Sequence, residues 1–478
     1  MTQYRHRLPT LTLATLMFAA STAIAAPPSP PLTSSAAEQT GVALTIYNAG
    51  LGLVKDRREL QLPRGRGELR FMDVASQIIP ESVHITPLAG RDTLRVLEQN
   101  YEYDLLNPQK LMDKYVGKEV KLYEKNPYSE REETVTATLV ANNGTPIYRI
   151  GSDITFNHPG RVTLPGVPDN LIPKPTLVWL LDNDREGSQA VEASYLTGGI
   201  SWKADYVLTL DKKDERADLE GWVTIDNRSG AAYRDARLKL VAGDVNRVRD
   251  DLPHREKALR MAAVAAAPPF KEQGLFEYHL YTLDRPATVK ENQTKQISLL
   301  SADSFPVKKE LLLKGENFYY YNPQGDTEGK QKVSVYVEFR NGAPAGPGMP
   351  LPKGTVRVYK EDGDGSLQFI GEDSIDHTPK DEKVRIKLGE AFDVVGNRKQ
   401  TDWKKVATDS YEAAFEITLR NHKSEDVTVR VIEPIPGDWK MLASSHDYTK
   451  GEAFAAEFLL PVKKDGETKL TYRVRMRY

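Results

Sequence analysis

The sequence predicts an all-β protein built from antiparallel β-sandwich modules, with a small inserted SH3-like barrel and one short helix. Three observations support this fold class: apolar and polar residues alternate along many short stretches, Asn, Asp and Gly cluster between the stretches, and a convincing helical pattern occurs only once. A side-chain period of two, interrupted by turn residues, is typical of antiparallel sheets. Because one face of each predicted sheet is apolar, each sheet needs a second layer to cover it.

The clearest alternation begins at Trp202 and continues to Ala242. Its first run ends in the charged segment 211–218, which is too polar to be buried and predicts a hairpin loop. A second run ends at the Asn-Arg-Ser-Gly sequence of 227–230, and a third run follows it. We therefore expect three consecutive strands of an antiparallel meander.

One helix is predicted, followed by the small barrel. Asn107 can cap the helix, Pro108 suits its first position, and Gly117 is placed to end it. Several short alternating stretches separated by tight turns follow up to residue 156. Short, closely spaced strands of this kind are typical of a small closed barrel.

The N-terminus has the pattern of a secretory signal peptide over residues 1–25. Arg5 and Arg7 precede a short apolar run, and an Ala-Ile-Ala sequence that ends at Ala25 supplies small residues for cleavage. We expect the cut after Ala25, and hence a periplasmic or secreted protein. Segment 26–40 is rich in Pro, Ser and Ala, which predicts a disordered linker. No later stretch is long and apolar enough for a transmembrane helix.

Changes in composition predict the domain boundaries. In order, the modules are an N-terminal β module (41–104), the short helix with the small barrel (105–172), a main β-sandwich (176–341) that contains a loop excursion (250–273), and a C-terminal β-sandwich (353–478). A Pro-rich segment precedes residue 176 and a Pro- and Gly-rich segment covers 342–353, so both are expected to be linkers.

Composition excludes several classes of function. The chain has 65 lysines and arginines against 67 aspartates and glutamates, so its near-neutral charge gives no reason to expect a nucleic-acid partner. It has no cysteine, which excludes thiol catalysis and thiolate metal sites. An exported protein without disulfides must rely on a large hydrophobic core.

No residue pattern indicates a catalytic, cofactor-binding or metal-binding residue, and we predict none. The eight histidines include no pair at a metal-ligand spacing. The acidic segment 361–366 is better explained as an Asp/Gly hairpin turn than as a calcium loop. Nucleophile elbows, phosphate loops and dinucleotide fingerprints are missing from the sequence. A carboxylate pair for glycoside cleavage stays open, because 67 acidic residues offer too many pairs to judge.

Two aromatic clusters contain the candidate binding residues. Tyr101 and Tyr103 form one cluster, and Tyr319 and Tyr320 belong to the other. Their rings could stack on sugars or pack between strands. The last strand alternates and ends in the aromatic Tyr478, as strands of outer-membrane barrels do, but other predicted strands carry charges near their middles, which favours a sandwich.

Four motifs resemble a known family. They are the YLTGGISW sequence of 195–202, the YHLYTL sequence of 278–283, the GED sequence of 371–373 and the GEAFD sequence of 389–393. As a set they resemble a bacterial secreted family that is a domain of unknown function, similar to the C-terminal domain of mucoidy-inhibitor-A-like proteins. The resemblance covers roughly residues 41–478. It implies a β-rich envelope protein and no catalytic residues, and the coiled-coil helices usual in the mucoidy-inhibitor type are absent from this sequence.

The sequence thus favours a non-enzymatic exported protein that binds or scaffolds at the cell envelope. An envelope protein or glycan, and no nucleic acid, would contact its loops or its long sheet edges, and no cofactor is expected. The segments 250–273 and 342–353 are the expected contact regions. Two alternatives stay open: a hydrolase of envelope glycan that uses a carboxylate pair, and an outer-membrane β-barrel.

Overall fold

The computed structural model describes residues 31–90, 92–125, 132–168, 171–243, 245–246, 270–324, 330–343, 346–451 and 454–477. In these segments the regular structure is almost entirely β, with a single α-helix, α1 (Pro108–Lys114). The predicted all-β fold class is therefore confirmed. The predicted signal peptide (1–25) and positions 250–269 of the predicted loop excursion lie outside the described residues.

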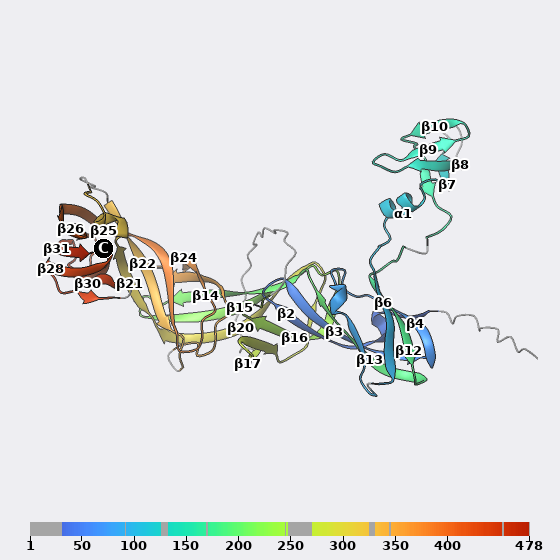
Figure 1. Ribbon diagram of the computed structural model, residues 1–478, viewed down its shortest axis with the longest axis horizontal. Coiled ribbons are helices and arrows are strands. Elements are labelled where there is room, and N and C mark those ends of the chain that lie inside the picture. The colour runs from blue at the N-terminus through green and yellow to red at the C-terminus, as the bar shows by residue number, and fades with distance from the viewer. Residues whose placement is uncertain are drawn as a thin grey trace, which may run out of the picture.

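The strands form a long body and one projecting insert (Figure 1). The body contains two large hydrophobic cores, which we call the first core and the second core in chain order. The insert, which contains α1, has a small third core of its own. The predicted domain boundaries at 104, 176 and 353 stay predictions. The first core has no buried member between Leu94 and Leu177, where the insert lies, but it draws on residues on both sides of 353.

Three sheets surround the first core. One has the order β1 (Leu32–Ser34), β4 (Gly65–Met72), β12 (Thr176–Asn183) and β6 (Leu94–Glu102). The largest has the order β17 (Phe270–Leu275), β18 (Tyr278–Leu283), β16 (Tyr233–Ala242), β2 (Gln39–Tyr47), β3 (Leu51–Leu62), β13 (Gly187–Thr197) and β5 (His84–Pro87), with β19 (Ala287–Val289) beside β16. The third has the order β20 (Gln293–Pro306), β15 (Arg216–Asn227), β14 (Ile200–Leu210), β23 (Gly354–Glu361) and β24 (Leu367–Ile375).

The predicted three-stranded meander is wrong in its last step. Strands β14 and β15 pair antiparallel as expected, but β16 pairs with β2 and β18 in the opposite sheet of the sandwich. The turn at 227–230 therefore carries the chain from one layer to the other. Its buried Asn227 donates side-chain hydrogen bonds to the carbonyls of Ala231 (2.8 Å) and Lys290 (3.0 Å). These bonds satisfy backbone groups that a sheet-to-sheet crossing would leave unpaired.

The second core lies inside one curled sheet. Its order is β28 (Asp438–Ser444), β31 (Gly466–Arg477), β26 (Ser410–Asn421), β25 (Lys383–Ala407), β22 (Lys330–Arg340), β21 (Lys308–Lys314), β27 (Val427–Pro434), β30 (Ala455–Val462) and β29 (Thr449–Lys450). Side chains of β26 and β31 meet those of β27 and β30 across this core. The curling gives the two layers of the predicted C-terminal sandwich from a single sheet.

Two strands belong to both cores. Val337 of β22 and Ile386 of β25 are buried in the first core, whereas Val333 and Val394 of the same strands are buried in the second. The pair β22–β25 is therefore an antiparallel ribbon, with two shifts of register, that joins the two cores. We call it the bridging ribbon.

The insert does not contain the predicted closed barrel. Its sheet is open, with the order β10 (Asp153–Phe156), β9 (Ile147–Ile150), β8 (Glu132–Ala141), β7 (Glu119–Lys125) and β11 (Arg161–Thr163), and no described pairing joins β10 to β11. Pro159 cannot donate a ladder hydrogen bond, and Asn157 turns the chain with a φ of 56°. The helix prediction is confirmed: Asn107 caps α1 by accepting the Lys110 amide at 2.9 Å.

Part of the predicted disordered linker is ordered. Strand β1 pairs parallel with β4, and a 3-10 turn, η1 (Ala36–Glu38), follows it. Ser35 and Glu38 form a capping box around this turn. Composition could not predict this, because the segment is fixed by long-range contacts such as the hydrogen bond from the Ala36 amide to Asp73 (3.0 Å).

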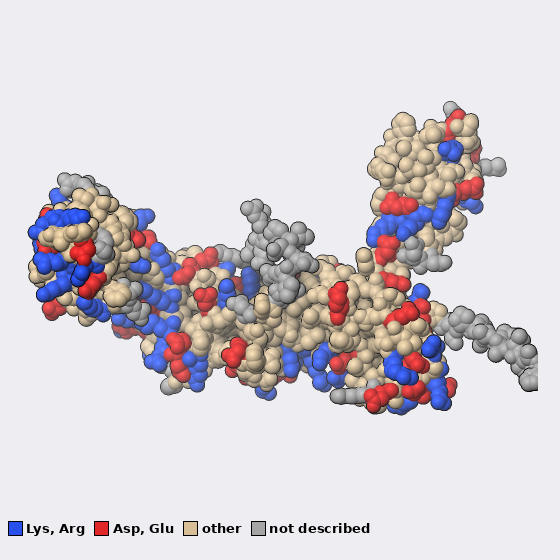
Figure 2. Space-filling model, viewed as in Figure 1, with Lys and Arg blue, Asp and Glu red and all other residues tan. Residues whose placement is uncertain are grey.

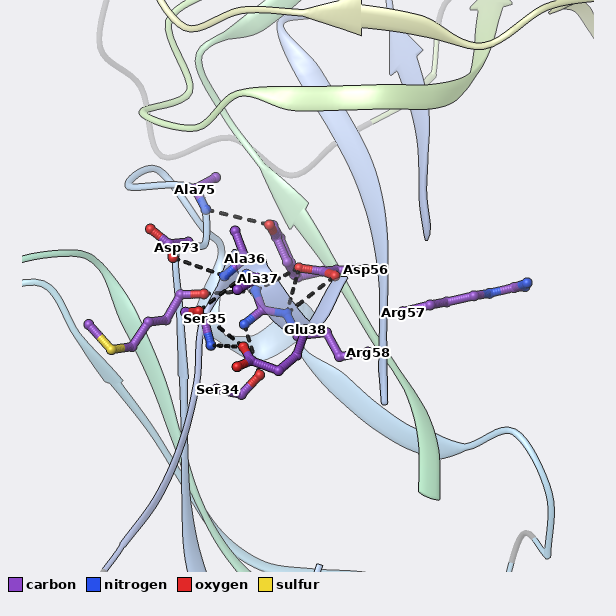
Figure 3. A network of polar contacts seen from close by, with 12 residues as sticks. Ser34, Ser35, Ala36, Ala37, Glu38, Asp56, Arg57, Arg58, Asp73 and Ala75 are labelled. Carbon is purple, nitrogen blue, oxygen red and sulfur yellow. Dashed lines mark hydrogen bonds and ion pairs between the residues drawn. The ribbon is translucent and has the colours of Figure 1, made fainter. Parts of the chain in front are cut away.

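A buried arginine holds β1 in place. Arg58 on β3 is fully buried and donates to Asp56 (2.8 Å), the Ser34 hydroxyl (3.2 Å) and the Met72 carbonyl (2.7 Å). Its guanidinium carbon lies 3.5 Å from the centre of the Phe71 ring. Figure 3 shows Arg58 inside this network and the neighbouring Arg57 pointing away from it.

Replacing Arg58 should destabilise the protein far more than replacing Arg57. The change Arg58→Ala leaves the Asp56 carboxylate buried without its cation, which costs about 3–5 kcal/mol in the free energy of unfolding. The change Arg57→Ala removes only a surface ion pair with Glu192, worth about 0–1 kcal/mol. Urea unfolding of the two variants measures both values, and equal losses would contradict this role for Arg58.

Candidate functional site

The four tyrosines singled out in the sequence do not form one site. Tyr101 and Tyr103 lie at the end of β6, where Tyr101 packs against the first core. Tyr319 and Tyr320 belong to a 3-10 turn, η3 (Asn317–Tyr320), at the second core. Each pair thus lies at a different core. A binding role for these four residues stays a prediction.

The first pair has one anchored ring and one free ring. The Tyr101 hydroxyl donates to the carbonyls of Ala75 (3.1 Å) and Ser76 (2.9 Å), and burial raises its pKa to about 12. The centre of the Tyr103 ring lies 5.6 Å from that of Tyr101, and Tyr103 is 67% exposed. Only Tyr103 of this pair has a face open to a ligand.

The second pair is mainly structural. Tyr320 is fully buried, and its hydroxyl meets Glu433 and the Tyr472 hydroxyl, each at 2.8 Å. Glu433 also forms a buried double hydrogen bond with Arg398, whose guanidinium lies over the Tyr319 ring. Burial, reinforced by the charge of Glu433, raises the pKa of Tyr320 well above its ordinary value. Tyr320 therefore cannot stack on a sugar without the core being opened.

Two of the four sequence motifs are explained by packing. The 195–202 motif forms the corner between β13 and β14, where Gly199 has a φ of 69° and a Cβ would lie 2.5 Å from the Gln77 amide. The ring of Trp202, at its end, contacts the ring of Tyr281 in the 278–283 motif at 6.4 Å between centres. Both aromatic residues are buried, so these motifs build the first core.

The other two motifs meet at the bridging ribbon. A Cβ on Gly371 of β24 would lie 2.4 Å from the Leu388 carbonyl oxygen of β25. Two residues further on, the Asp373 carboxylate accepts a 2.7 Å hydrogen bond from the Lys387 amide. Glycine thus allows the edge of the third sheet to touch the strand that leads into the second core. No local pattern in the sequence indicates that these two motifs are neighbours in space.

The 389–393 motif presents a phenylalanine to solvent. Ser334 pairs with Glu390 and Lys332 pairs with Val395, so one residue of β22 faces the four residues 391–394 of β25. In this bulge Phe392 is 94% exposed. Alternation alone would have placed Phe392 on the same face as the buried Val394, and only the bulge turns it outward.

The bulge is held on both sides. The Asp393 carbonyl accepts a 2.7 Å hydrogen bond from the His422 amide. On the other side Glu390 accepts from the Ser334 hydroxyl (3.0 Å) and pairs with Lys387 (2.9 Å). Partial burial acts to raise the pKa of Glu390, but these two partners outweigh it and lower the pKa. We call Gly371, Asp373, Lys387, Glu390 and Phe392 the junction site.

Buried carboxylates in the described segments have cationic partners. They are Asp56 with Arg58, Glu310 with Arg385 and Arg430, Glu338 with Lys383 and Arg385, Glu412 with Arg475 and Lys404, and Glu433 with Arg398. A glycosidase acid needs a carboxyl group whose pKa is raised. At Glu390 and Glu412 the environment lowers the pKa instead. No group of histidines and carboxylates arranged to hold a metal ion occurs among the described residues.

Several outer strands of the sheets have interrupted edges. The register of β6, β20, β24 and β28 with their single neighbours is broken by bulges, and β5 ends in Pro87. Bulges and proline at an edge disfavour extended pairing with another chain. The outer strand β17 pairs with β18 without a bulge, and the predicted use of long sheet edges stays a prediction. The predicted contact segment 342–353 is partly fixed by the fold. Leu351 forms a β-bridge to Thr378, and the side chain of the buried Asn341, just before the segment, donates to the Met349 carbonyl at 2.8 Å.

Charges of both signs are mixed on the face of the molecule shown in Figure 2. Lys and Arg lie beside Asp and Glu over the body, and the outer end of the insert is largely uncharged on the face shown in Figure 2. No described helix has the length and apolar character to cross a membrane.

The match to a family model covers the region of these motifs. The model of a domain of unknown function, DUF4139, matches residues 191–440, just over half of the 478 residues, and all four motifs lie in this range. No curated protein matches the chain.

Substituting Gly371 should loosen the contact between β24 and β25. In Gly371→Ala the added Cβ collides with the Leu388 carbonyl, so we expect the free energy of unfolding to fall by about 1–3 kcal/mol. Gly363 in the same hairpin has open space around a Cβ, and Gly363→Ala should change stability by less than about 0.5 kcal/mol. Chemical denaturation of both variants measures the difference, and an unchanged Gly371→Ala would refute the close contact.

Proposed function

Because the chain belongs to the DUF4139 family of domains of unknown function, we propose that it is an exported, non-enzymatic binding protein of the cell envelope. Its body acts as a rigid scaffold, and the junction site binds a partner protein. The proposal includes a relationship to mucoidy-inhibitor-A-like proteins, which rests on the likeness of the four motifs. The match to the family model does not extend to this relationship.

The exposure of Phe392 carries the proposal. Exposing a complete aromatic ring to water forfeits the stabilisation that its burial would bring, about 1.5–3 kcal/mol. Here the ring sits on a bulge that both neighbouring strands hold in place. Buried aromatic anchors dominate the energetics of protein interfaces, and charged groups around them add specificity. Phe392 with Glu390 and Lys387 has this composition.

The paired carboxylates favour binding over hydrolysis. A hydrolase would need a carboxyl group that keeps its proton at neutral pH, and a cleft to hold the glycan. At Glu412 the hydrogen bond from Arg475 and the ion pair with Lys404 lower the pKa instead. A hollow lined by Leu32, Leu62 and Leu181 has a volume of 30 Å³, which is far too small for a sugar ring.

Cross-linking through position 392 tests the junction site. A photoreactive phenylalanine analogue at 392 should capture one defined protein in the envelope of the source cells. Phe156 is the control position, because it is 68% exposed but lies on the insert, outside the family match. With the captured protein purified, Phe392→Ala should weaken binding at least tenfold, about 1.4 kcal/mol, since anchor residues commonly contribute more than this.

The stability of Phe392→Ala separates binding from folding. An exposed side chain contributes little to the free energy of unfolding, so this value should change by less than about 0.5 kcal/mol. Equal capture at 392 and 156, or unchanged affinity of Phe392→Ala for the purified partner, would overturn the role of the junction site.

Export has its own test. The basic residues before a short apolar run, and the small residues that end at Ala25, support removal of a signal peptide. Protein recovered from a periplasmic extract should begin at Ala26 when its N-terminus is sequenced. Recovery of the chain only from the cytoplasm, with its first residues intact, would contradict the proposed location.

A further inference from the structure

A second phenylalanine projects from the family-matched region, at the apex of the β17–β18 hairpin. Residues 273–277 are all exposed, and Phe276 at their centre is 90% exposed. The register pairs Leu275 with Tyr278, so Phe276 and Glu277 are the two residues of the turn. Figure 1 shows β17 at the margin of the body. The apex is therefore open to a partner.

The backbone at Phe276 is unfavourable for its side chain. Its φ of 57° lies in the left-handed region, which bulky residues avoid and which Gly, Asn and Asp tolerate. Ten described non-glycine residues have a positive φ, and eight of them are Asp, Asn or Ser; the exceptions are Phe276 and Phe454. A residue that tolerates a positive φ, such as Gly or Asn, would relax the backbone at position 276.

Packing against the described residues does not explain this choice. The nearest ring is that of Tyr278, with 6.5 Å between centres, and it leaves Phe276 almost fully exposed. Leu275, which immediately precedes Phe276, is 43% exposed. A strained backbone and an exposed ring at one position are costs that a contact outside the chain would offset.

The charges beside the apex identify the kind of contact. Glu277 has no ion pair in the part of the chain that the structure describes, and Glu272 on the facing strand pairs with His279 at 2.8 Å. Further along, Lys271 pairs with Asp284 at 3.2 Å. Acidic groups around the apex disfavour insertion among anionic lipid head groups and favour a cationic neighbour. Phe392 is likewise followed by an acid, Asp393.

We propose that Phe276 is a second anchor for the protein partner, filling an apolar pocket bordered by lysine or arginine that pairs with Glu277. This inference rests on the proposed function and adds a second contact to it. The hairpin apex and the junction site then give two separate attachments within residues 191–440. Two linked contacts raise the affinity for one partner above that of either alone.

Capture at two positions tests the inference in the full-length protein. A photoreactive phenylalanine analogue is placed at 276 or at 392 in the source cells, and the captured polypeptides are identified. The expected result is the same polypeptide from both positions. Capture at 392 but not at 276 would refute the second anchor and leave the proposed function intact, whereas no capture at either position would refute both.

A substitution that relaxes the turn separates binding from structure. Phe276→Asn suits the left-handed backbone, so the melting temperature should stay the same or rise, while affinity for the purified partner falls at least tenfold. Glu277→Lys should weaken binding several-fold, and Glu291→Lys, on an exposed turn elsewhere, should not.

Any one of four results would overturn the proposal. Phe276→Asn could bind the partner as the wild type does, or lose stability, which would indicate a packing role. Glu277→Lys could leave affinity unchanged, which would exclude the basic border. Vesicles of phosphatidylethanolamine and phosphatidylglycerol could bind the wild type and not Phe276→Asn, which would make the apex a membrane contact.

Discussion

The bridging ribbon is the constraint on which the architecture of the body depends. Strands β22 and β25 carry their hydrogen-bond ladder from the first core into the second, so the two cores cannot separate without breaking it. The ladder is interrupted where the ribbon passes from one core to the other, because the four residues 391–394 of β25 face a single residue of β22. In this bulge Val394 is buried in the second core, whereas Phe392 is 94% exposed. The exposed ring is thus tied to the change of register between the two cores.

Each of the two large cores is also closed by one buried arginine. Arg58 connects β3 of the eight-stranded sheet to β1 and to the end of β4, which lie in another sheet. Arg398 on β25 joins Glu433 on β27, and Tyr472 on β31 completes that network. Burying such ions is costly unless every donor has an acceptor. These groups are satisfied only when the layers are in their native register, so they specify how the layers fit together.

Much of the fold follows from alternation and turn residues, and the remainder depends on contacts that are remote in sequence. The period of two identified the strands, and Asn107 with Pro108 identified the one described helix. The local pattern could not reveal that the chain crosses to another sheet at the turn 227–230, or that the sheet of the insert does not close into a barrel. For the candidate site, the motif containing Phe392 was visible, but its exposure follows from the register with β22, which one strand does not encode. Tyr320 is the opposite case, because it belongs to an aromatic-rich turn in which Phe318 is 56% exposed, yet its own ring is fully buried.

The manner in which the insert joins the body has a consequence for how the chain can change. Strands β6 and β12 are antiparallel neighbours, and Glu102 lies directly opposite Thr176. The whole insert thus occupies the place of a hairpin loop, and its own small core is independent of the others. A short turn could join β6 to β12 in place of the insert. The entropic cost of closing the hairpin would change little, because it depends only weakly on loop length. Recombination could therefore lengthen, shorten or exchange the insert, while the two large cores of the body continue to stabilise the fold.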